Sequence, residues 1–260
     1  NRGNCFMLDV TRIPETMKLK DRGSLLTGLI AGLADHEHAV ALVCVKSDEM
    51  AKKGDFLFIT KNGQVKRTAA AEYGIRRARF AAINLKGNDE LVGMVQVDPE
   101  DKDDIILITQ LGMALRFKLD TVSCTGRATA GVRGIDVGKD DEVRWFEIPK
   151  AGDMLFVLSD RGFGKRMLSD DVERQGRAGK GQKLLTMNKT GETGTQVAVC
   201  LNVTGAKSVR VEQKHGHTVL LNMDEIAVER RVSKGQLLVN VLLDDVVQYG
   251  ALTAETKDEK

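Results

Sequence analysis

The chain is 260 residues long, with 42% hydrophobic residues, 29% charged residues and a formal net charge of +2 at pH 7. This composition excludes a disordered chain, and the small net charge means that any affinity for a polyanion comes from local patches. The four cysteines form no Cys-x-x-Cys pair, and no apolar run approaches the ~20 residues that span a bilayer. These features argue against a zinc ribbon and predict a soluble, cytoplasmic protein.

Short apolar runs cut by glycine turns follow one another along the chain, which is the pattern of an all-β protein. The turn units read NRGNCFML, TKNGQVKRT, TQLGMALRF, SDRGFGKRM and QKHGHTVLL, and their glycines are Gly3, Gly63, Gly112, Gly162 and Gly216. Successive turn glycines lie 49 to 60 residues apart. The sequence therefore contains five repeats of about 50 residues.

A second glycine opens a later apolar run in four of the repeats. It is Gly23, Gly134, Gly181 or Gly235, 19 to 22 residues after the turn glycine, and the second repeat has none. Repeats with several strands each predict blades in sequence, as in a β-propeller, and an open solenoid is the rival architecture. No long linker divides the chain, so we expect one β-domain over 1–250 and a polar tail over 251–260.

Cations recur four residues after the turn glycine. Arg67, Arg116 and Arg166 hold this position in the middle three repeats, and Lys66 and Lys165 precede two of them. A single cation here would only solvate a strand end. Three in matching register predict a row of guanidinium groups, because equivalent positions of neighbouring blades lie side by side on one rim.

The loops after these turns carry further cations. They are Arg76, Arg77 and Arg79 in the second repeat, Arg127 and Arg133 in the third, and Arg174, Arg177, Lys180 and Lys183 in the fourth. Glycine lets a backbone approach a phosphate closely and offer its N–H groups, while the cations neutralise it. The sequence predicts that these residues and those of the row contact phosphate groups of a polyanion. For the loop 175–182 alone, a flexible turn that happens to be basic is the alternative.

No catalytic or cofactor site is predicted. The stretch GKGQ lacks the hydroxyl residue of a P-loop, and Gly-x-Gly-x-x-Gly is absent. The pairs His36 with His38 and His215 with His217 lie in different repeats, which favours surface histidines over a metal site. There is no Gly-x-Ser-x-Gly elbow and no coherent Ser/His/Asp set. We therefore expect no cofactor and no metal.

Three stretches carry a resemblance to a known family. They are TKNGQVKRTAAAEYG with AAINLKGNDELVGM, ITQLGMALRF with GRATAGVRGIDVGKDDEV, and DRGFGKRMLSDDVERQGRAGKG. In this order they resemble the C-terminal domain of the A subunit of bacterial type IIA topoisomerases, DNA gyrase and topoisomerase IV. The likeness covers nearly the whole chain, and it is strong in repeats two to four and weak in repeat five.

The resemblance implies a β-pinwheel of about five to six blades, a propeller-like disc whose blades exchange strands and whose basic rim binds and bends DNA. It also implies partners in a bacterial, nucleoid-associated enzyme, namely the ATPase B subunit, the A-subunit core and a second copy of the A subunit, with no membrane. The catalytic tyrosine belongs to that core, and no stretch here matches its motif. The chain is therefore expected to be no enzyme on its own but part of an ATP-dependent type II topoisomerase.

A motif that separates the two enzymes bears on the choice between them. Gyrase carries a box, Gln-Arg-Arg-Gly-Gly-Lys/Arg-Gly, in its first blade. QGRAGKG resembles it at Gln175, Arg177, Gly179, Lys180 and Gly181, but in a later blade where relaxed versions occur in both enzymes. The first unit resembles the family's second blade, so the box-bearing blade either precedes Asn1 or is missing. The weakly basic fifth repeat favours topoisomerase IV over gyrase.

The predicted function is sequence-independent binding and bending of duplex DNA, which presents a DNA segment for strand passage. The alternative is a β-propeller scaffold that docks proteins and uses its charged rim for solubility. An exposed aromatic cluster would favour the scaffold, yet aromatic residues make up only 4% of the chain. A propeller hydrolase would need His or carboxylate residues converging from several blades, and none align across the repeats.

Overall fold

The computed structural model describes residues 1–16, 22–44, 54–100 and 102–253. Contacts divide the chain into a first unit, Asn1–Asp101 with Val122–Arg133, and a second unit, Lys102–Thr121 with Gly134–Lys260. Strands dominate, and the one α-helix of the described ranges is α1, Leu26–Leu29. No described helix is long and apolar enough to cross a membrane. The all-β prediction is confirmed, while the division into 1–250 and a tail stays a prediction because 254–260 lie outside the described residues.

Repeats two to five each begin with an antiparallel hairpin. The hairpins are β2 (Asp55–Thr60) with β3 (Gln64–Ala69), β6 (Asp104–Thr109) with β7 (Met113–Lys118), β10 (Met154–Ser159) with β11 (Phe163–Leu168), and β14 (Ser208–Gln213) with β15 (Thr218–Asn222). All five turn glycines have φ between 76° and 90°, the left-handed region that favours glycine. The turn units of repeats two to five are therefore hairpin turns, while Gly3 lies in a bend before Asn4.

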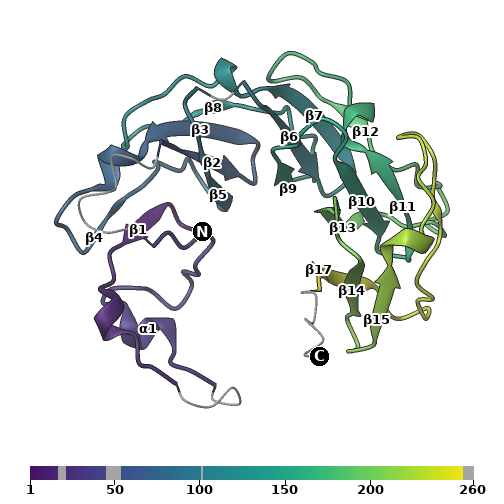
Figure 1. The fold of residues 1–260 in the computed structure, drawn as a ribbon, viewed down its shortest axis with the longest axis horizontal. Coiled ribbons are helices and arrows are strands. Elements are labelled where there is room, and N and C mark those ends of the chain that lie inside the picture. The colour runs from purple at the N-terminus through teal and green to yellow at the C-terminus, as the bar shows by residue number, and fades with distance from the viewer. Residues whose placement is uncertain (17–21, 45–53, 101, 254–260) are drawn as a thin grey trace. The chain divides into compact units, whose positions relative to one another are not determined.

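Figure 1 shows the sheets that these hairpins build. In the first unit, β1 (Asn4–Phe6) pairs with β4 (Arg79–Ala81), and the second sheet has the order β5-β2-β3-β8, with β5 Leu91–Val97 and β8 Val132–Arg133. In the second unit the orders are β12-β7-β6-β9, β13-β10-β11-β16 and β15-β14-β17. The added strands are β9 (Val143–Glu147), β12 (Gln182–Lys183), β13 (Val197–Asn202), β16 (Gln236–Leu237) and β17 (Val247–Leu252). The 3₁₀ helices are η1 (Val10–Arg12), η3 (Ala70–Tyr73), η4 (Leu119–Thr121), η5 (Ser169–Asp171) and η6 (Met223–Glu225).

Neighbouring repeats exchange strands. The last strand of each four-stranded sheet, β8, β12 or β16, comes from the repeat that follows the hairpin. Each is two residues long and pairs with the second strand of that hairpin. In β8, for example, Arg133 pairs with Gln64 of β3. The division into units follows this exchange, because Val122–Arg133 groups with the hairpin that receives it. The strand exchange that the resemblance implied is confirmed.

A glycine stands immediately before each exchanged strand. Gly131, Gly181 and Gly235 have φ of +83°, +78° and +73°, and each follows its turn glycine by 19 residues. A Cβ on any of them would collide with a carbonyl oxygen of the hairpin strand that it crosses. Only glycine allows this approach, so the second landmark of the third repeat is Gly131, and its assignment to Gly134 from spacing was wrong.

Both faces of the central strands are covered. Every residue of β2 and of β6 is buried, which explains their continuous apolar runs. The core of the first unit gathers Phe56, Phe58, Tyr73 and Phe80 around the hairpin β2–β3. The second unit has two further core clusters, one between the sheets of β6 and β10 and one between those of β10 and β14.

Candidate nucleic-acid interface

The three arginines of the predicted row occupy equivalent places in their hairpins. Arg67, Arg116 and Arg166 pair across the hairpin with Leu57, Ile106 and Phe156. Each also forms an isolated parallel bridge with the next repeat, at Cys124, Arg174 and Val228 respectively. The matching register expected from the sequence is therefore present, with Arg67 in the first unit and the other two in the second.

These guanidinium groups are engaged within the fold. Arg67 Nε lies 3.2 Å from Asp55 Oδ2, and Arg116 Nε donates to Asp104 Oδ2 at 2.7 Å. Their side chains are only 14% and 13% exposed. At the place of these aspartates the fourth repeat has Met154, and Arg166 Nε donates instead to the carbonyl of Ile226 at 2.8 Å. Arg67 and Arg116 are thus held by an aspartate of their own hairpin and Arg166 by a carbonyl of the following repeat, so the structure does not show a row of open guanidinium groups.

Arg116 makes further contacts with the following repeat. It also binds Asp170 Oδ1 at 2.9 Å and donates to the carbonyl of Ser169 at 3.3 Å. Burial lowers the pKa of Arg116, but the hydrogen bonds to Asp170 and Asp104 outweigh it and the pKa is raised overall. The carboxylates therefore occupy N–H donors that a phosphate would otherwise take.

Lys66 and Lys165 are buried, although the sequence predicts that they contact DNA. They are 1% and 0% exposed. Lys66 Nζ donates to the carbonyls of Ala82 and Arg127, and Lys165 Nζ to those of Arg230, Arg231 and Ser233. Burial lowers the pKa of each from 10.5 to about 8. A phosphate cannot reach either ammonium group in this structure, so for these two lysines the prediction of direct contact is wrong.

Three equivalent segments, which we name the arm loops, cross from one repeat to the hairpin before it. They are residues 125–131, 175–181 and 229–235, and each ends at its positive-φ glycine. Their first residue donates its N–H to the carbonyl of Arg67, Arg116 or Arg166 at 2.8 Å. Four residues before the glycine, each loop has an arginine, namely Arg127, Arg177 and Arg231. All three are partly exposed.

Arg230 and Arg231 are cations of the fifth repeat's arm loop that were not predicted from the sequence. When the repeats are aligned on the turn glycine, the fifth repeat has Leu220 where the middle three repeats have an arginine. This alignment makes the fifth repeat weakly basic. The signal that identifies its arm loop is Gly235, at the same 19-residue spacing as Gly181. Aligning the repeats on this glycine, rather than on the turn, reveals the shared arginine.

Most of the remaining predicted cations lie at the surface. Exposed residues are Arg76, Arg77, Arg79, Arg133, Arg174, Lys180 and Lys183. Arg79 stacks on Phe6 with 5.3 Å from guanidinium carbon to ring centroid, and the 52% exposed Arg174 binds Asp104 at 2.9 Å. The side chains of Arg76, Arg77, Lys180 and Lys183 form no hydrogen bond or ion pair within the described ranges. These four are the most available to a phosphate.

The box-like loop 175–181 is held by its backbone. Ala178 N–H donates to the carbonyl of Gly134 at 2.7 Å, and the Gly179 carbonyl accepts from Asp136 N–H at 2.8 Å. Gly181 lets the loop approach the carbonyl of Ala114 on β7, so its glycine serves packing within the fold. A Cβ added at Gly176 would meet nothing within 4 Å, so this glycine of the loop has open space beside it.

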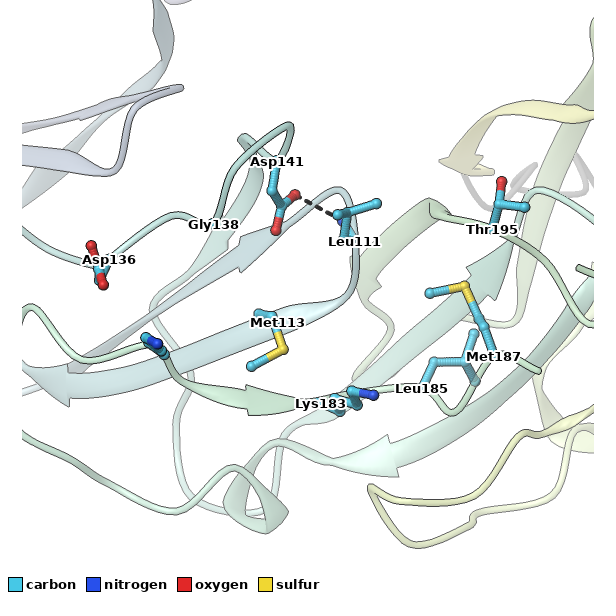
Figure 2. A pocket seen from close by; sticks show the side chains of 10 residues that line it. Leu111, Met113, Asp136, Gly138, Asp141, Lys183, Leu185, Met187 and Thr195 are labelled. Carbon is cyan, nitrogen blue, oxygen red and sulfur yellow. Dashed lines mark hydrogen bonds between the residues drawn. The ribbon is translucent and has the colours of Figure 1, made fainter. Parts of the chain in front are cut away.

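A cavity of about 490 Å³ lies beside this loop in the second unit. Figure 2 shows Met113, Leu185 and Met187 among its lining residues, together with Lys183. Asp141, also in the lining, accepts a hydrogen bond from the Leu111 N–H at 2.9 Å and so caps a turn. No group of three or more His, Cys, Asp or Glu residues suited to a metal occurs in the described part of the chain.

Comparison with known proteins gives consistent matches. The family model described as DNA gyrase C-terminal domain, beta-propeller, matches residues 54–98, 103–150 and 153–193. The A subunit of DNA gyrase from Deinococcus deserti is 33% identical over 265 residues, covering 100% of this chain and 32% of the relative. Its counterpart from Chlamydia trachomatis is 30% identical over 250 residues, covering 95% and 29%. The chain thus spans about a third of the length of these relatives.

Solved structures show the same fold. The C-terminal domain of DNA topoisomerase IV has a TM-score of 0.86 at 24% identity, covering 96% of this chain and 76% of that one. The DNA gyrase A C-terminal domain has a TM-score of 0.74 at 18% identity, covering 98% and 80%. The three segments of the family match are the middle repeats that carry the strongest resemblance. The chain therefore belongs to the DNA gyrase C-terminal domain family and has the strand-exchanged sheets of a β-pinwheel.

Proposed function

We propose that the chain binds duplex DNA without sequence preference and bends it, and that the cations on and beside the arm loops make the contacts. The supporting observation is that an arginine recurs at one position of all three arm loops, with exposed cations such as Lys180 and Lys183 next to it. Contacts to phosphates carry no sequence information, and arginine and lysine are the side chains that make them. Bending a 20–30 base-pair segment costs of order 1–6 kcal/mol, which several such contacts offset.

A titration of fluorescent duplex DNA at several salt concentrations tests this proposal. If about six phosphates are neutralised, the log-log slope of affinity against salt lies near −5, a loss of roughly a thousandfold from 50 to 200 mM. AT-rich and GC-rich duplexes should bind equally. The double variant Lys180→Ala, Lys183→Ala should flatten the slope by roughly two units. The matched control is Lys118→Ala with Lys189→Ala, two exposed lysines that lie neither in an arm loop nor in an exchanged strand. Equal slopes for both double variants would reject the arm-loop interface.

For the longer protein, we propose that this domain is part of an A subunit, where it presents a DNA segment for strand passage. The partners proposed are the ATPase B subunit, the A-subunit core and a second copy of the A subunit. The relatives support this because they are themselves A subunits of about three times this length. The named curated relatives are gyrase subunits, while the solved structures include both enzymes. The preference for topoisomerase IV stays a prediction, which a supercoiling assay on the full-length protein tests.

The protein-docking scaffold remains a second candidate because the last repeat exposes apolar side chains. Leu243 is 98% exposed and Leu242 is 65% exposed. Among the large exposed hydrophobics of the described ranges, Tyr249 is the single aromatic, which is few for the core of a docking surface. Absence of DNA binding at 50 mM salt would favour the scaffold.

A further inference from the structure

The same contact recurs at two places in the molecule. The residue three positions after the turn glycine is Lys66 in the second repeat and Lys165 in the fourth. Each donates from Nζ to the carbonyl of the arginine four positions before the arm glycine, Arg127 at 2.5 Å and Arg231 at 2.6 Å. One contact lies in the first unit and the other in the second. Two separate occurrences in equivalent geometry indicate a shared role.

Backbone carbonyls surround the ammonium of Lys165. Its Nζ lies 2.8 Å from Arg230 O, 2.9 Å from Ser233 O and 3.0 Å from Ser233 Oγ, besides Arg231 O, so two of these four oxygens share one N–H. An ammonium has three N–H donors and no acceptor, so it suits a pocket made only of oxygen acceptors. Burying a charge is costly unless it is hydrogen-bonded, and these bonds offset that cost only while the loop keeps its path. Burial of the charged Lys165 side chain is therefore favourable only while the arm loop 229–235 keeps this path.

The backbone carbonyl and the guanidinium of Arg231 contact different parts of the fold. Its carbonyl faces Lys165, while its guanidinium donates to Lys183 O at 2.7 Å and Asp171 O at 3.2 Å. Two of its five N–H donors are used in these bonds. Arg127 likewise turns its carbonyl to Lys66 and stacks its guanidinium on Phe80, 4.9 Å from the ring centroid. In both loops, an inward carbonyl sets the direction of a partly exposed guanidinium.

We propose that Lys66 and Lys165 are positioning residues, each of which holds the arm loop of the following repeat so that Arg127 or Arg231 is presented to a DNA phosphate. This inference rests on the proposed function and assigns to the two lysines a part in DNA binding without touching DNA. It accounts for cations in a buried position where an apolar residue would otherwise pack.

The third repeat supplies a natural control. Its equivalent residue is Leu115, and the arm loop above it, 175–181, is held by the backbone bonds at Ala178 and Gly179. No ammonium is needed there. An intervention that supplies an ammonium should therefore act on a variant of Lys165 and leave a variant of Leu115 unchanged.

The test uses Lys165→Met, Lys165→Ala and, as control, Leu115→Ala. Hydrogen exchange of the peptide spanning 229–238 reports loop order, because the amides of Glu229 and Leu238 are bonded to β11 and its turn. We expect exchange of this peptide to accelerate roughly tenfold in both lysine variants. DNA affinity should fall about tenfold, as for one lost phosphate contact. Propylammonium, which replaces the atoms deleted in Lys165→Ala, should restore both quantities. Tetramethylammonium at equal concentration, which has no N–H donor, should not. Leu115→Ala, followed through the peptide spanning 175–184 that covers it, should respond to neither.

The outcomes separate this inference from the proposed function. Unchanged exchange in the lysine variants, or rescue of Leu115→Ala by propylammonium, overturns the inference. Faster exchange with unchanged DNA affinity also overturns it, since the loop would then be ordered for another purpose. If the unaltered chain binds no DNA, the proposed function fails, and the positioning role fails with it, whatever the exchange shows. Should neither lysine variant fold, Ser233→Ala removes one acceptor, and the same peptide should exchange roughly threefold faster; no change would count against the inference.

Discussion

The arm loops 175–181 and 229–235 take the same path over successive hairpins of the second unit, but different contacts hold them. The loop 229–235 contains no glycine before Gly235 and closes around Lys165. The loop 175–181 has three glycines and a left-handed Ala178, and it lies over Leu115. One loop is organised by a buried charge and the other by backbone bonds to residues 134 and 136.

This difference shows which part of the arm loop the fold demands. Both loops end in a positive-φ glycine whose Cβ would collide with the hairpin below. The interior varies because either an ammonium or a set of backbone N–H and C=O groups can satisfy the polar atoms of the loop. Both loops require the glycine at their end. The contacts that hold the rest of the loop differ between the two.

The largest effect is expected where the two loops agree. Gly181→Ala and Gly235→Ala should each lower the free energy of unfolding by about 3 to 5 kcal/mol, because a Cβ collides with backbone and the φ is left-handed. Urea unfolding measures this. Gly176→Ala is the matched control, since it has open space around a Cβ and should stay within about 1 kcal/mol. A small loss in Gly181→Ala would show that the loop can detach from β7 at little cost.

The pH dependence of stability should distinguish the loop that has a buried lysine. Burial lowers the pKa of Lys165 from 10.5 to about 8, so the folded chain releases this proton before the unfolded chain does. Between these values the unfolded chain binds more protons, and the free energy of unfolding rises with pH. The rise attributable to Lys165 is at most about 3 kcal/mol.

Urea unfolding of the unaltered chain and of Lys165→Met between pH 7.5 and 10 measures that rise as a difference. Subtraction removes the groups that both proteins share, including Lys66, whose pKa burial also lowers to about 8. The difference in unfolding free energy should grow with pH across the window. A difference independent of pH would mean that Lys165 keeps its proton in the folded chain.

The positions of the turns and the register of the repeats were predictable from the sequence, whereas the burial of individual lysines was not. The turn glycines and the register of Arg67, Arg116 and Arg166 follow from spacing, because a repeat in sequence becomes a repeat in structure. The burial of Lys66 and Lys165 does not follow from spacing. Both lysines alternate with the row arginines along their strands, but the segment that covers them comes from the following repeat. Only the path of the arm loops in the structure reveals that cover.

A substitution at Asp104 tests the difference between the arginine contacts beneath the loop 175–181 and those beneath the loop 229–235. Asp104 binds both Arg116 and Arg174, whereas Met154 stands at its place in the fourth repeat. Asp104→Met should cost about 2 kcal/mol, less than a fully broken buried pair, because Arg116 keeps Asp170. Arg174, released from its carboxylate, should raise DNA affinity about threefold at low salt.

The exposed Asp120 provides the control for net charge in that experiment. Asp120→Met removes the same charge without releasing an arginine, so stability should change by less than about 0.5 kcal/mol. If both variants raise DNA affinity equally, the gain comes from overall charge and not from Arg174.

The smallest effect concerns the residue that makes the loop 175–181 unusual. Ala178 has φ +67°, a left-handed conformation that costs a residue with a Cβ about 1 to 2 kcal/mol. Ala178→Gly removes this cost but gives the unfolded chain more freedom, which costs about 0.4 to 1 kcal/mol. The net expectation is a stabilisation of about 0.5 kcal/mol by urea unfolding. Val232, at the equivalent place in 229–235, has no left-handed φ to relieve. Val232→Gly should therefore destabilise the chain. Opposite signs at two equivalent positions would establish that the loops reach one path through different backbone conformations, and equal signs would refute it.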